Sequence, residues 1–572
     1  MRKISIRLIC LPVIMLLLQG SLAFASRSEP ASAKHAMVVS QHILASEIGT
    51  DMMRKGGNAV DAAVAVGFAL AVVYPEAGNL GGGGFMVIRL ADGRSTAIDY
   101  REMAPEAATR DIYLDGKGEQ IEGEGGSVLG YRSAGVPGTP AGFEYAFKKY
   151  GSGKITWRQV LEPARRLAQN GFVLSRRLAA LFVEYKDSLN RYPDSRRIFL
   201  NGGKYFEQGD VLIQRDLAKT LERLQSSGSS DFYRGMTAKL IADDMARNKG
   251  LITLNDLKNY EVRERTPVTG TYRGNKIVSM PPPSSGGIVL IQVLNMLEPF
   301  DLDALGHNSA AKYHLLTETM RRAFADRAAY MGDPDFAEIP TEYLTSKAYA
   351  LQRGSTIKEK QASESKNVRE GQLTGKEGTE TTHYTVVDPA GAVVTNTYTI
   401  NNIYGSAVTA KGTGVLLNDE MDDFAVSPGK PNLFGLVQGE INAVGPRKRP
   451  LSSMTPTIVL KRDGTLWFAL GARGGPRIIS AVLQSTINMI DHGMNIQEAL
   501  DAPRIHHQWL PNEIFWEKYG LSNDSRRILS SYGHVFSSGP RGIASATAIA
   551  VGSDGTKYGA IDSRSDGAAV GF

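Results

Sequence analysis

The chain has 572 residues, of which 42% are hydrophobic and 22% charged, which is ample for a large core and would usually predict several domains. Its formal net charge of +6 falls to +3 without the three basic residues of the N-terminal leader, so composition gives no reason to propose nucleic acid or an anionic membrane as a partner. The only cysteine, Cys10, lies in that leader, which excludes disulfides and Cys-ligated zinc or haem from the mature chain.

The first 25 residues predict an export signal. Arg2, Lys3 and Arg7 precede an apolar segment at 8–18, and a small-x-small site at 23–25 comes directly before Ser26. An uncleaved anchor is the alternative, but this apolar segment is too short to span a bilayer, and no later segment is long enough. We expect an exported protein, periplasmic or secreted, with no membrane anchor once 1–25 is removed.

The first part of the mature chain predicts a buried Ala-rich helix at 57–70 and a strand at 85–90, joined by a run of four glycines at 81–84. A phosphate-binding loop would follow a strand and open a helix, so these glycines indicate close backbone packing rather than nucleotide binding. Helical spacing then dominates the middle third, at 160–170, 216–225, 236–248, 288–297 and 310–330.

A polar segment, 354–380, ends the helical part of the chain. Ten of its 27 residues are charged and only four are aliphatic or alanine, so we expect a flexible segment. Two strands, 383–387 and 393–400, follow immediately around a turn at 388–391. Further hairpins are predicted around 462–464 and 553–555, and helices at 476–492 and 496–502. This mixture fits two sheets with helices outside them, as one layered domain.

Thr381 stands where the polar segment meets the first of these strands. Cleavage of the Glu380–Thr381 bond by the Thr381 hydroxyl would create a nucleophile whose own α-amine serves as its base. An ordinary Thr at the start of a strand is the alternative, because Thr is a good strand residue.

Seven segments, taken in order, resemble γ-glutamyltranspeptidases over nearly the whole mature chain. They are residues 79–85, 99–102, 280–287, 381–384, 417–424, 449–457 and 474–475. The resemblance implies an α/β (α+β) fold, the four-layer αββα sandwich of N-terminal nucleophile hydrolases, formed from one self-cleaved precursor. Residues 26–380 would become a large subunit and 381–572 a small subunit of the same αββα unit.

The resemblance also implies site roles. Thr381 would be the nucleophile and its α-amine the base, Thr399 would orient the Thr381 hydroxyl, and Gly474 and Gly475 would form the oxyanion hole. The substrate would be glutathione or another γ-glutamyl compound, and the acceptor water, an amino acid or a peptide. Its α-carboxylate would bind Arg101, Ser452 and Ser453. Its α-ammonium would bind Asn401, Glu420 and Asp423. Residue type alone would indicate an ordinary strand residue for Thr399 and a simple strand-to-helix turn for Gly474-Gly475. It would indicate solvated surface charge for Arg101, Glu420 and Asp423.

The sequence departs from the commoner family pattern at several site positions. Arg473 stands where Pro is frequent, and Pro476 where Ser is frequent, so the geometry of the oxyanion hole could differ. Glu420 replaces a Gln and adds a negative charge. In the lid loop at 428–435, Phe434 stands where Tyr is frequent and removes a hydroxyl that could latch the lid.

Neither a cofactor nor a metal is expected. His506 and His507 are adjacent, so on a strand they point to opposite faces and do not chelate one ion. His383 is expected to pack or to gate substrate entry rather than to act as the base.

Two rival functions remain open. A cephalosporin or glutaryl acylase would use the same nucleophile on a side chain without an α-ammonium, which Glu420 and Asp423 argue against. A non-catalytic periplasmic binding protein would keep the pocket without turnover, which the presence of Thr381, Thr399 and Gly474-Gly475 argues against.

Overall fold

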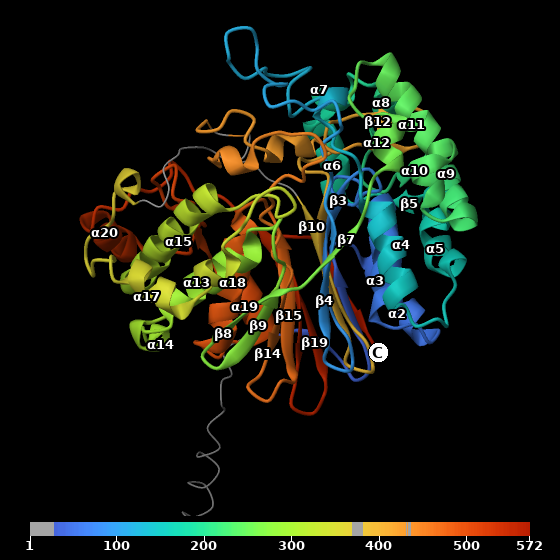
Figure 1. Ribbon diagram of the computed structural model, residues 1–572. Coiled ribbons are helices and arrows are strands. Elements are labelled where there is room, and N and C mark those ends of the chain that lie inside the picture. The colour runs from blue at the N-terminus through green and yellow to red at the C-terminus, as the bar shows by residue number, and fades with distance from the viewer. Residues whose placement is uncertain (1–27, 369–380, 431, 433–435) are drawn as a thin grey trace, which may run out of the picture.

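The computed structural model describes residues 28–368, 381–430, 432 and 436–572. Two seven-stranded sheets face each other, and helices cover both outer faces, which gives four layers (Figure 1). The predicted αββα architecture is confirmed. In this part of the chain, no helix is both long and apolar enough to cross a membrane.

The first sheet carries the head of the second predicted subunit at its centre. Its named strand pairs are all antiparallel. Its strands, in spatial order, are β20 (Ala568–Gly571), β2 (Met37–Ser40), β10 (Thr382–Val387), β11 (Val393–Thr399), β3 (Gly83–Arg89), β4 (Ser95–Tyr100) and β7 (Arg263–Arg265). β10 and β11 are rich in β-branched and aromatic residues and are buried along their whole length, because sheet and helices cover both faces.

The second sheet is also antiparallel throughout its named pairs. Its strands, in spatial order, are β1 (Ala31–Ala33), β19 (Lys557–Ile561), β18 (Ser545–Val551), β15 (Leu466–Arg473), β14 (Thr457–Leu460), β9 (Asn275–Ser279) and β8 (Val268–Tyr272). β10 and β11 pack against β15, so the two sheet centres meet face to face. The three predicted hairpins are confirmed as β10–β11, β14–β15 and β18–β19.

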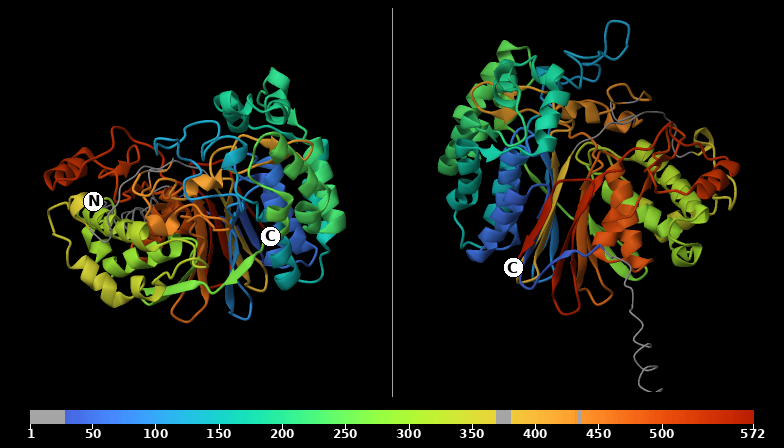
Figure 2. Two further views of the ribbon diagram at one scale, coloured as in Figure 1. Left: turned by 45° about the horizontal axis from the view of Figure 1, so that its top comes forward. Right: turned by 180° about the vertical axis from the view of Figure 1, so that it is seen from behind.

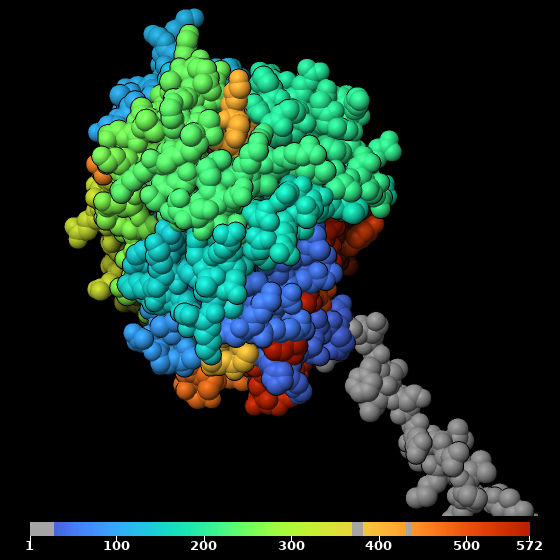
Figure 3. All heavy atoms as spheres, turned by 90° about the vertical axis from the view of Figure 1, so that its right-hand side faces the viewer, coloured from blue at the N-terminus to red at the C-terminus, as the bar shows by residue number. Residues whose placement is uncertain are grey.

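One helical layer packs on the outer face of the first sheet and forms the surface seen from that side (Figure 3). Its helices are α2 (Ile43–Arg54), α3 (Ala59–Val73), α4 (Thr139–Tyr150), α5 (Trp157–Asn170), α6 (Arg176–Glu184), α7 (Lys186–Leu189), α8 (Pro193–Phe199), α9 (Arg215–Ser227), α10 (Ser230–Arg234), α11 (Met236–Arg247) and α12 (Leu254–Lys258). α3 is buried on every side, and its N-terminus is closed by a capping box of Asn58 and Asp61.

The other helical layer covers the second sheet (Figure 2). Its helices are α13 (Gly286–Leu297), α14 (Leu302–Leu305), α15 (Ala310–Tyr330), α16 (Thr341–Leu344), α17 (Lys347–Gly354), α18 (Arg477–Ile490), α19 (Ile496–Asp501) and α20 (Asn523–Ser531). Short strand pairs complete the fold, namely β5 (Phe172–Val173) with β6 (Val211–Leu212), β12 (Thr409–Ala410) with β13 (Val415–Leu416), and β16 (Ile505–His506) with β17 (Phe515–Trp516). The helices predicted from periodicity are confirmed to within a few residues at each end.

Two expectations about irregular segments meet different outcomes. The glycine run is confirmed as a close backbone contact, since a Cβ on Gly82 would collide with the Thr399 carbonyl oxygen. The expected flexible segment is wrong for 354–368, which packs on α15 and the C-terminal part of the chain. Ser365 is buried there, accepts a hydrogen bond from Arg321, and its carbonyl accepts another from the Trp509 indole at 2.8 Å. These polar contacts add to the packing of Ile357 and Val368 against the core. The rest of the segment, 369–380, lies outside the described residues.

Candidate active site

Thr381 lies at the mouth of the central hairpin, one residue before β10. The antiparallel register pairs Thr382 with Tyr398, which sets Thr381 opposite Thr399 at the end of β11. The Thr381 hydroxyl points at the Thr399 hydroxyl with 3.4 Å between the oxygens, and the Asn401 N–H donates to Thr399 Oγ1 at 2.8 Å. Thr381 is 5% exposed, so this hydroxyl lies in a sheltered place that a small molecule can still reach through a cavity.

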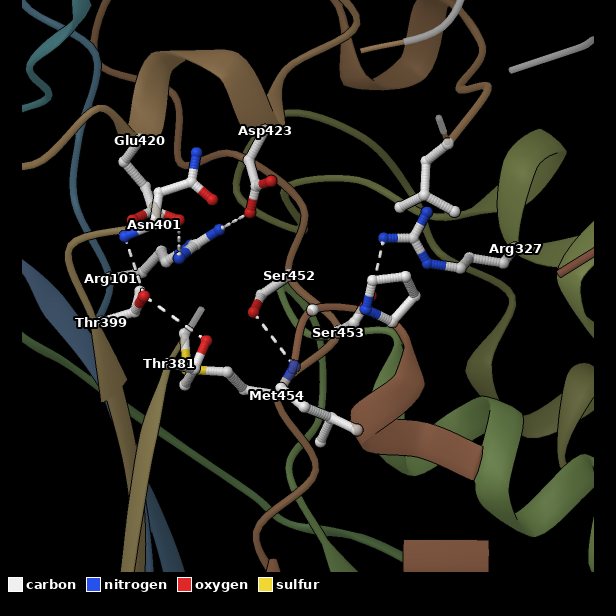
Figure 4. Close-up of a pocket in the computed structure, with 14 residues that line it drawn as sticks. Arg101, Arg327, Thr381, Thr399, Asn401, Glu420, Asp423, Ser452, Ser453 and Met454 are labelled. Atoms are coloured by element: carbon white, nitrogen blue, oxygen red, sulfur yellow. Dashed lines mark hydrogen bonds and ion pairs between the residues drawn. The ribbon is translucent and has the colours of Figure 1, made fainter. Parts of the chain in front are cut away.

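That cavity collects nearly all the candidate residues (Figure 4). The residues that line it and that the sequence indicated are Arg101, Thr381, Thr399, Asn401, Glu420, Asp423, Ser452, Ser453, Gly475 and Pro476. Four further lining residues, Arg327, Leu436, Met454 and Ile478, were not indicated. Glu380 and Phe434 lie outside the described residues.

Arg101 provides the positive charge at one side of the cavity. It follows β4 and is completely buried, and its backbone N–H donates to Asp99 Oδ1 at 3.0 Å. The guanidinium forms ion pairs with Glu420 and Asp423, and its Nε donates to the Pro450 carbonyl at 3.2 Å. Burial by itself would lower the pKa of Arg101, but the charges of Glu420, Asp423 and Glu102 outweigh it and raise the pKa above its ordinary value, so the guanidinium stays charged.

Glu420 and Asp423 come from one short 3₁₀ turn, Glu420–Asp423. Glu420 is 1% exposed, whereas the Asp423 side chain is 15% exposed and faces the cavity. Burial raises the pKa of Glu420 well above its ordinary value. Glu102, which is also completely buried, has an oxygen 3.5 Å from Arg101 Nη1, and burial raises its pKa to about 7. One guanidinium thus faces three acidic groups, of which Glu102 and Glu420 are completely buried.

Asn401 is held beside this turn. Its side-chain amide donates to the Asp419 carbonyl at 3.0 Å, and its backbone has a positive φ of 74°. Asparagine tolerates this left-handed conformation better than most residues do. Asn401 lines the same cavity as Glu420 and Asp423.

The hydroxyls of Ser452 and Ser453 come from the loop between Pro450 and β14. The Met454 N–H donates to Ser452 Oγ at 3.1 Å, and Arg327 Nη2 donates to Ser453 Oγ at 3.2 Å. The segment 281–285, Pro-Pro-Pro-Ser-Ser, packs against this loop, since the Ser285 N–H donates to the Ser452 carbonyl at 2.8 Å. Two segments that the sequence singled out separately therefore form one wall.

Gly474 and Gly475 form the turn between β15 and α18. Their φ values of 133° and 57° are both positive, and a Cβ on Gly474 would lie 2.8 Å from Ala544 Cα. Glycine is therefore required here for conformation and for space. Gly475 lines the cavity, and the turn leads into the N-terminus of α18, where helix N–H groups and the helix dipole favour negative charge. Arg473 ends β15, with its guanidinium 5.9 Å from the Tyr74 ring centre.

The histidines lie away from this chemistry. His383 is completely buried between Thr397 and Thr385, with its ring against Gly471, and burial lowers its pKa to about 3. A neutral ring packed between two sheets is a structural element. His506 bonds Ser480 and Gln508, whereas His507 accepts from the Trp509 N–H. Across the described ranges, no three His, Cys, Asp or Glu side chains form a group suited to a metal ion.

The described residues around the lid loop join it to the acidic turn. The Asn432 amide donates to the Asp422 carbonyl at 3.1 Å and accepts from the Leu436 N–H at 3.1 Å. Leu436 lines the cavity. The loop therefore borders the cavity at its C-terminal end.

Comparison with known proteins agrees with this geometry. The family model for gamma-glutamyltranspeptidase matches residues 45–572. A glutathione hydrolase proenzyme of Escherichia coli is 48% identical over 537 residues, which cover 94% of this chain and 91% of the relative.

Solved structures show the same fold. The gamma-glutamyltranspeptidase of Helicobacter pylori is 46% identical, with a TM-score of 0.57 over 61% of this chain and 98% of that one. A cephalosporin acylase from Bacillus halodurans has a TM-score of 0.83 at 26% identity, over 97% of this chain and 98% of that one.

Proposed function

The chain belongs to the γ-glutamyltranspeptidase family, and we propose that it transfers the γ-glutamyl group of glutathione and related γ-glutamyl compounds to water, amino acids or short peptides. The reaction would run through an ester on Thr381. The observation that carries this proposal is the sheltered Thr381–Thr399 hydroxyl pair in the same cavity as Arg101, Glu420 and Asp423.

Maturation is the first step. The Thr381 hydroxyl attacks the Glu380 carbonyl, the peptide nitrogen leaves as the new α-amine of Thr381, and water hydrolyses the resulting ester. The products would be 26–380 and 381–572, held together by the shared sheet, because β10 and β11 lie between β2 and β3 of the first fragment. We propose a heterodimer on this ground, formed after export and removal of 1–25.

Turnover would use the same hydroxyl. The α-amine of Thr381 takes the hydroxyl proton while the oxygen attacks the γ-carbonyl carbon, since a free α-amine has a pKa of about 7.7–8.0. The Gly474 and Gly475 N–H groups would stabilise the oxyanion. The intermediate then expels the Cys-Gly amine, which takes the proton back from the α-ammonium, and leaves a γ-glutamyl ester. Water or an acceptor amine attacks this ester in the second half of the reaction.

Charge complementarity supports a zwitterionic substrate. Without substrate, the Arg101 guanidinium forms ion pairs with both Glu420 and Asp423. An α-amino acid head carries one charge of each sign, so its carboxylate can take over the guanidinium with the Ser452 and Ser453 hydroxyls. Its ammonium then satisfies the two acids and the Asn401 amide oxygen, and no buried charge is left alone.

The lid assignment extends this picture. Phe434 would cover the pocket without the hydrogen bond that a tyrosine hydroxyl offers. We propose no cofactor or metal, since the amine, hydroxyl and amide groups above supply every proton transfer in the scheme.

Mass spectrometry of the purified protein tests the proposal directly. Fragments beginning at residues 26 and 381, together with release of glutamate or transfer products from glutathione, support it. A single intact chain that binds but does not turn over γ-glutamyl compounds would instead identify a binding protein. A preference for glutaryl over γ-glutamyl amides would identify an acylase, the activity named for the Bacillus halodurans relative.

A further inference from the structure

Arg327 lies in the same cavity as Thr381, on the side away from Arg101 (Figure 4). It comes from the last turn of α15 and is 1% exposed. Burying a cationic side chain costs free energy unless the charge is hydrogen-bonded or paired. The hydrogen bonds of Arg327 indicate its role in the cavity.

Arg327 donates hydrogen bonds to two serines of the cavity wall, Ser453 and Ser285. Its Nη2 donates to Ser453 Oγ at 3.2 Å, and its Nε donates to Ser285 Oγ at 2.8 Å. Ser285 Oγ in turn donates to the Ser452 carbonyl at 2.7 Å. Arg101 Nε binds the Pro450 carbonyl, so the loop 450–453 is held between two guanidinium groups.

The direction of these bonds fixes the polarity of the hydroxyls. A guanidinium can only donate, so Ser453 Oγ must accept from Arg327, and the hydroxyl proton of Ser453 is left to point elsewhere. The same holds for Ser452, whose oxygen accepts from the Met454 N–H. Both hydroxyls therefore keep a proton to donate, and a carboxylate is the partner that accepts from both.

We infer that Arg327 is a positioning residue for recognition of the substrate α-carboxylate, acting through the Ser453 hydroxyl and through Ser285. This inference rests on the proposed function. Its content is distinct, because turnover requires Thr381, whereas discrimination between an α-carboxylate and a neutral group of the same shape would depend on Arg327 as well as on Arg101.

The test compares L-glutamate with its α-amide, L-isoglutamine, as competitive inhibitors of γ-glutamyl anilide hydrolysis. In Arg327→Met, the Ki for L-glutamate should rise at least about tenfold, because a charged hydrogen-bond network is lost, while the Ki for L-isoglutamine and kcat change less than about threefold. Arg327→Lys should recover part of the selectivity. In a Ser453→Ala background, Arg327→Met should have a much smaller effect on the Ki for L-glutamate, since the two residues act as a unit.

A matched control separates this role from general destabilisation. Arg322 lies five residues earlier on α15 and is 2% exposed, but its guanidinium binds Glu318, Thr356 and Ser363 instead of Ser285 and Ser453. Arg322→Met should therefore lower thermal stability without changing the glutamate-to-isoglutamine ratio.

Two outcomes would overturn the inference. One is an unchanged ratio of the Ki for L-glutamate to the Ki for L-isoglutamine in Arg327→Met. The other is an equal loss of affinity for both inhibitors. If Arg327→Met does not mature into two fragments, Ser285→Ala gives the decision, since it removes one branch of the network and should raise the Ki for L-glutamate relative to that for L-isoglutamine about two- to fivefold. Wild-type protein that neither cleaves nor turns over would refute the proposed function instead.

Discussion

Replacing Arg101 with alanine tests how the cavity recognises its substrate. The guanidinium is completely buried and forms ion pairs with Glu420 and Asp423, with Glu102 3.5 Å away. Its removal deletes the partner of the substrate carboxylate and leaves the acids without their counter-charge. Truncating one partner of a buried charge pair costs about 2–5 kcal/mol, which is roughly 30-fold to several thousand-fold in kcat/KM.

The assay is the steady-state hydrolysis of a γ-glutamyl anilide by the matured protein. Cleavage into two fragments and the melting temperature show whether Arg101→Ala still folds, because breaking a buried ion pair also destabilises a fold by about 3–5 kcal/mol. Arg101→Lys should be intermediate, since lysine keeps the charge but lacks the planar fork.

Arg110→Ala is the matched control. Arg110 is the next arginine after Arg101 in the chain, but it forms a solvent-exposed ion pair with Glu440. Such pairs contribute about 0–1 kcal/mol to stability. Its kcat/KM should stay within about twofold of wild type. A matured Arg101→Ala protein with near-wild-type kcat/KM would refute the assignment of Arg101 to the α-carboxylate.

Three further predictions follow from the site. Thr381→Ala should remain one chain without activity, as seen on a denaturing gel, and cleavage of that variant at 380–381 would rule out self-processing by Thr381. Burial raises the pKa of Glu420 and brings that of Glu102 to about 7, so the pocket gains protons and loses negative charge as pH falls through about 7. L-glutamate should then bind more weakly below pH 7 than above it, and Glu102→Gln should flatten this dependence near pH 7. A parallel pH profile in both proteins would contradict titration of Glu102 as its cause. Phe434→Tyr should raise the transfer-to-hydrolysis ratio a few-fold at fixed acceptor concentration, because one neutral hydrogen bond contributes about 0.5–1.5 kcal/mol to a closed lid. An unchanged or lower ratio would show that apolar cover, not a latch, controls water access.

Local patterns in the sequence determined much of the framework. Two strand-like runs around the turn at 388–391 predicted the hairpin β10–β11, and helical spacing predicted α15 with its bounds. Such patterns are local, because side-chain periodicity and turn residues act over a few positions. The ordered motifs added the identities of the candidate site residues, including Arg101 and Glu420.

Tertiary structure alone decided how these pieces meet. Periodicity shows which face of a strand is buried but not which strand lies beside it. The position of β10 between β2 and β11 could therefore not be predicted from the sequence. The packing of 354–368 was missed because its two packed apolar residues, Ile357 and Val368, are supplemented by buried hydrogen bonds that composition does not reveal. Arg327 was missed because α15 is buried around most of its circumference, so no polar face marks the side that reaches the cavity. Its link to Ser453, 126 positions away, exists only because α15 and the serine loop pack together in the folded chain.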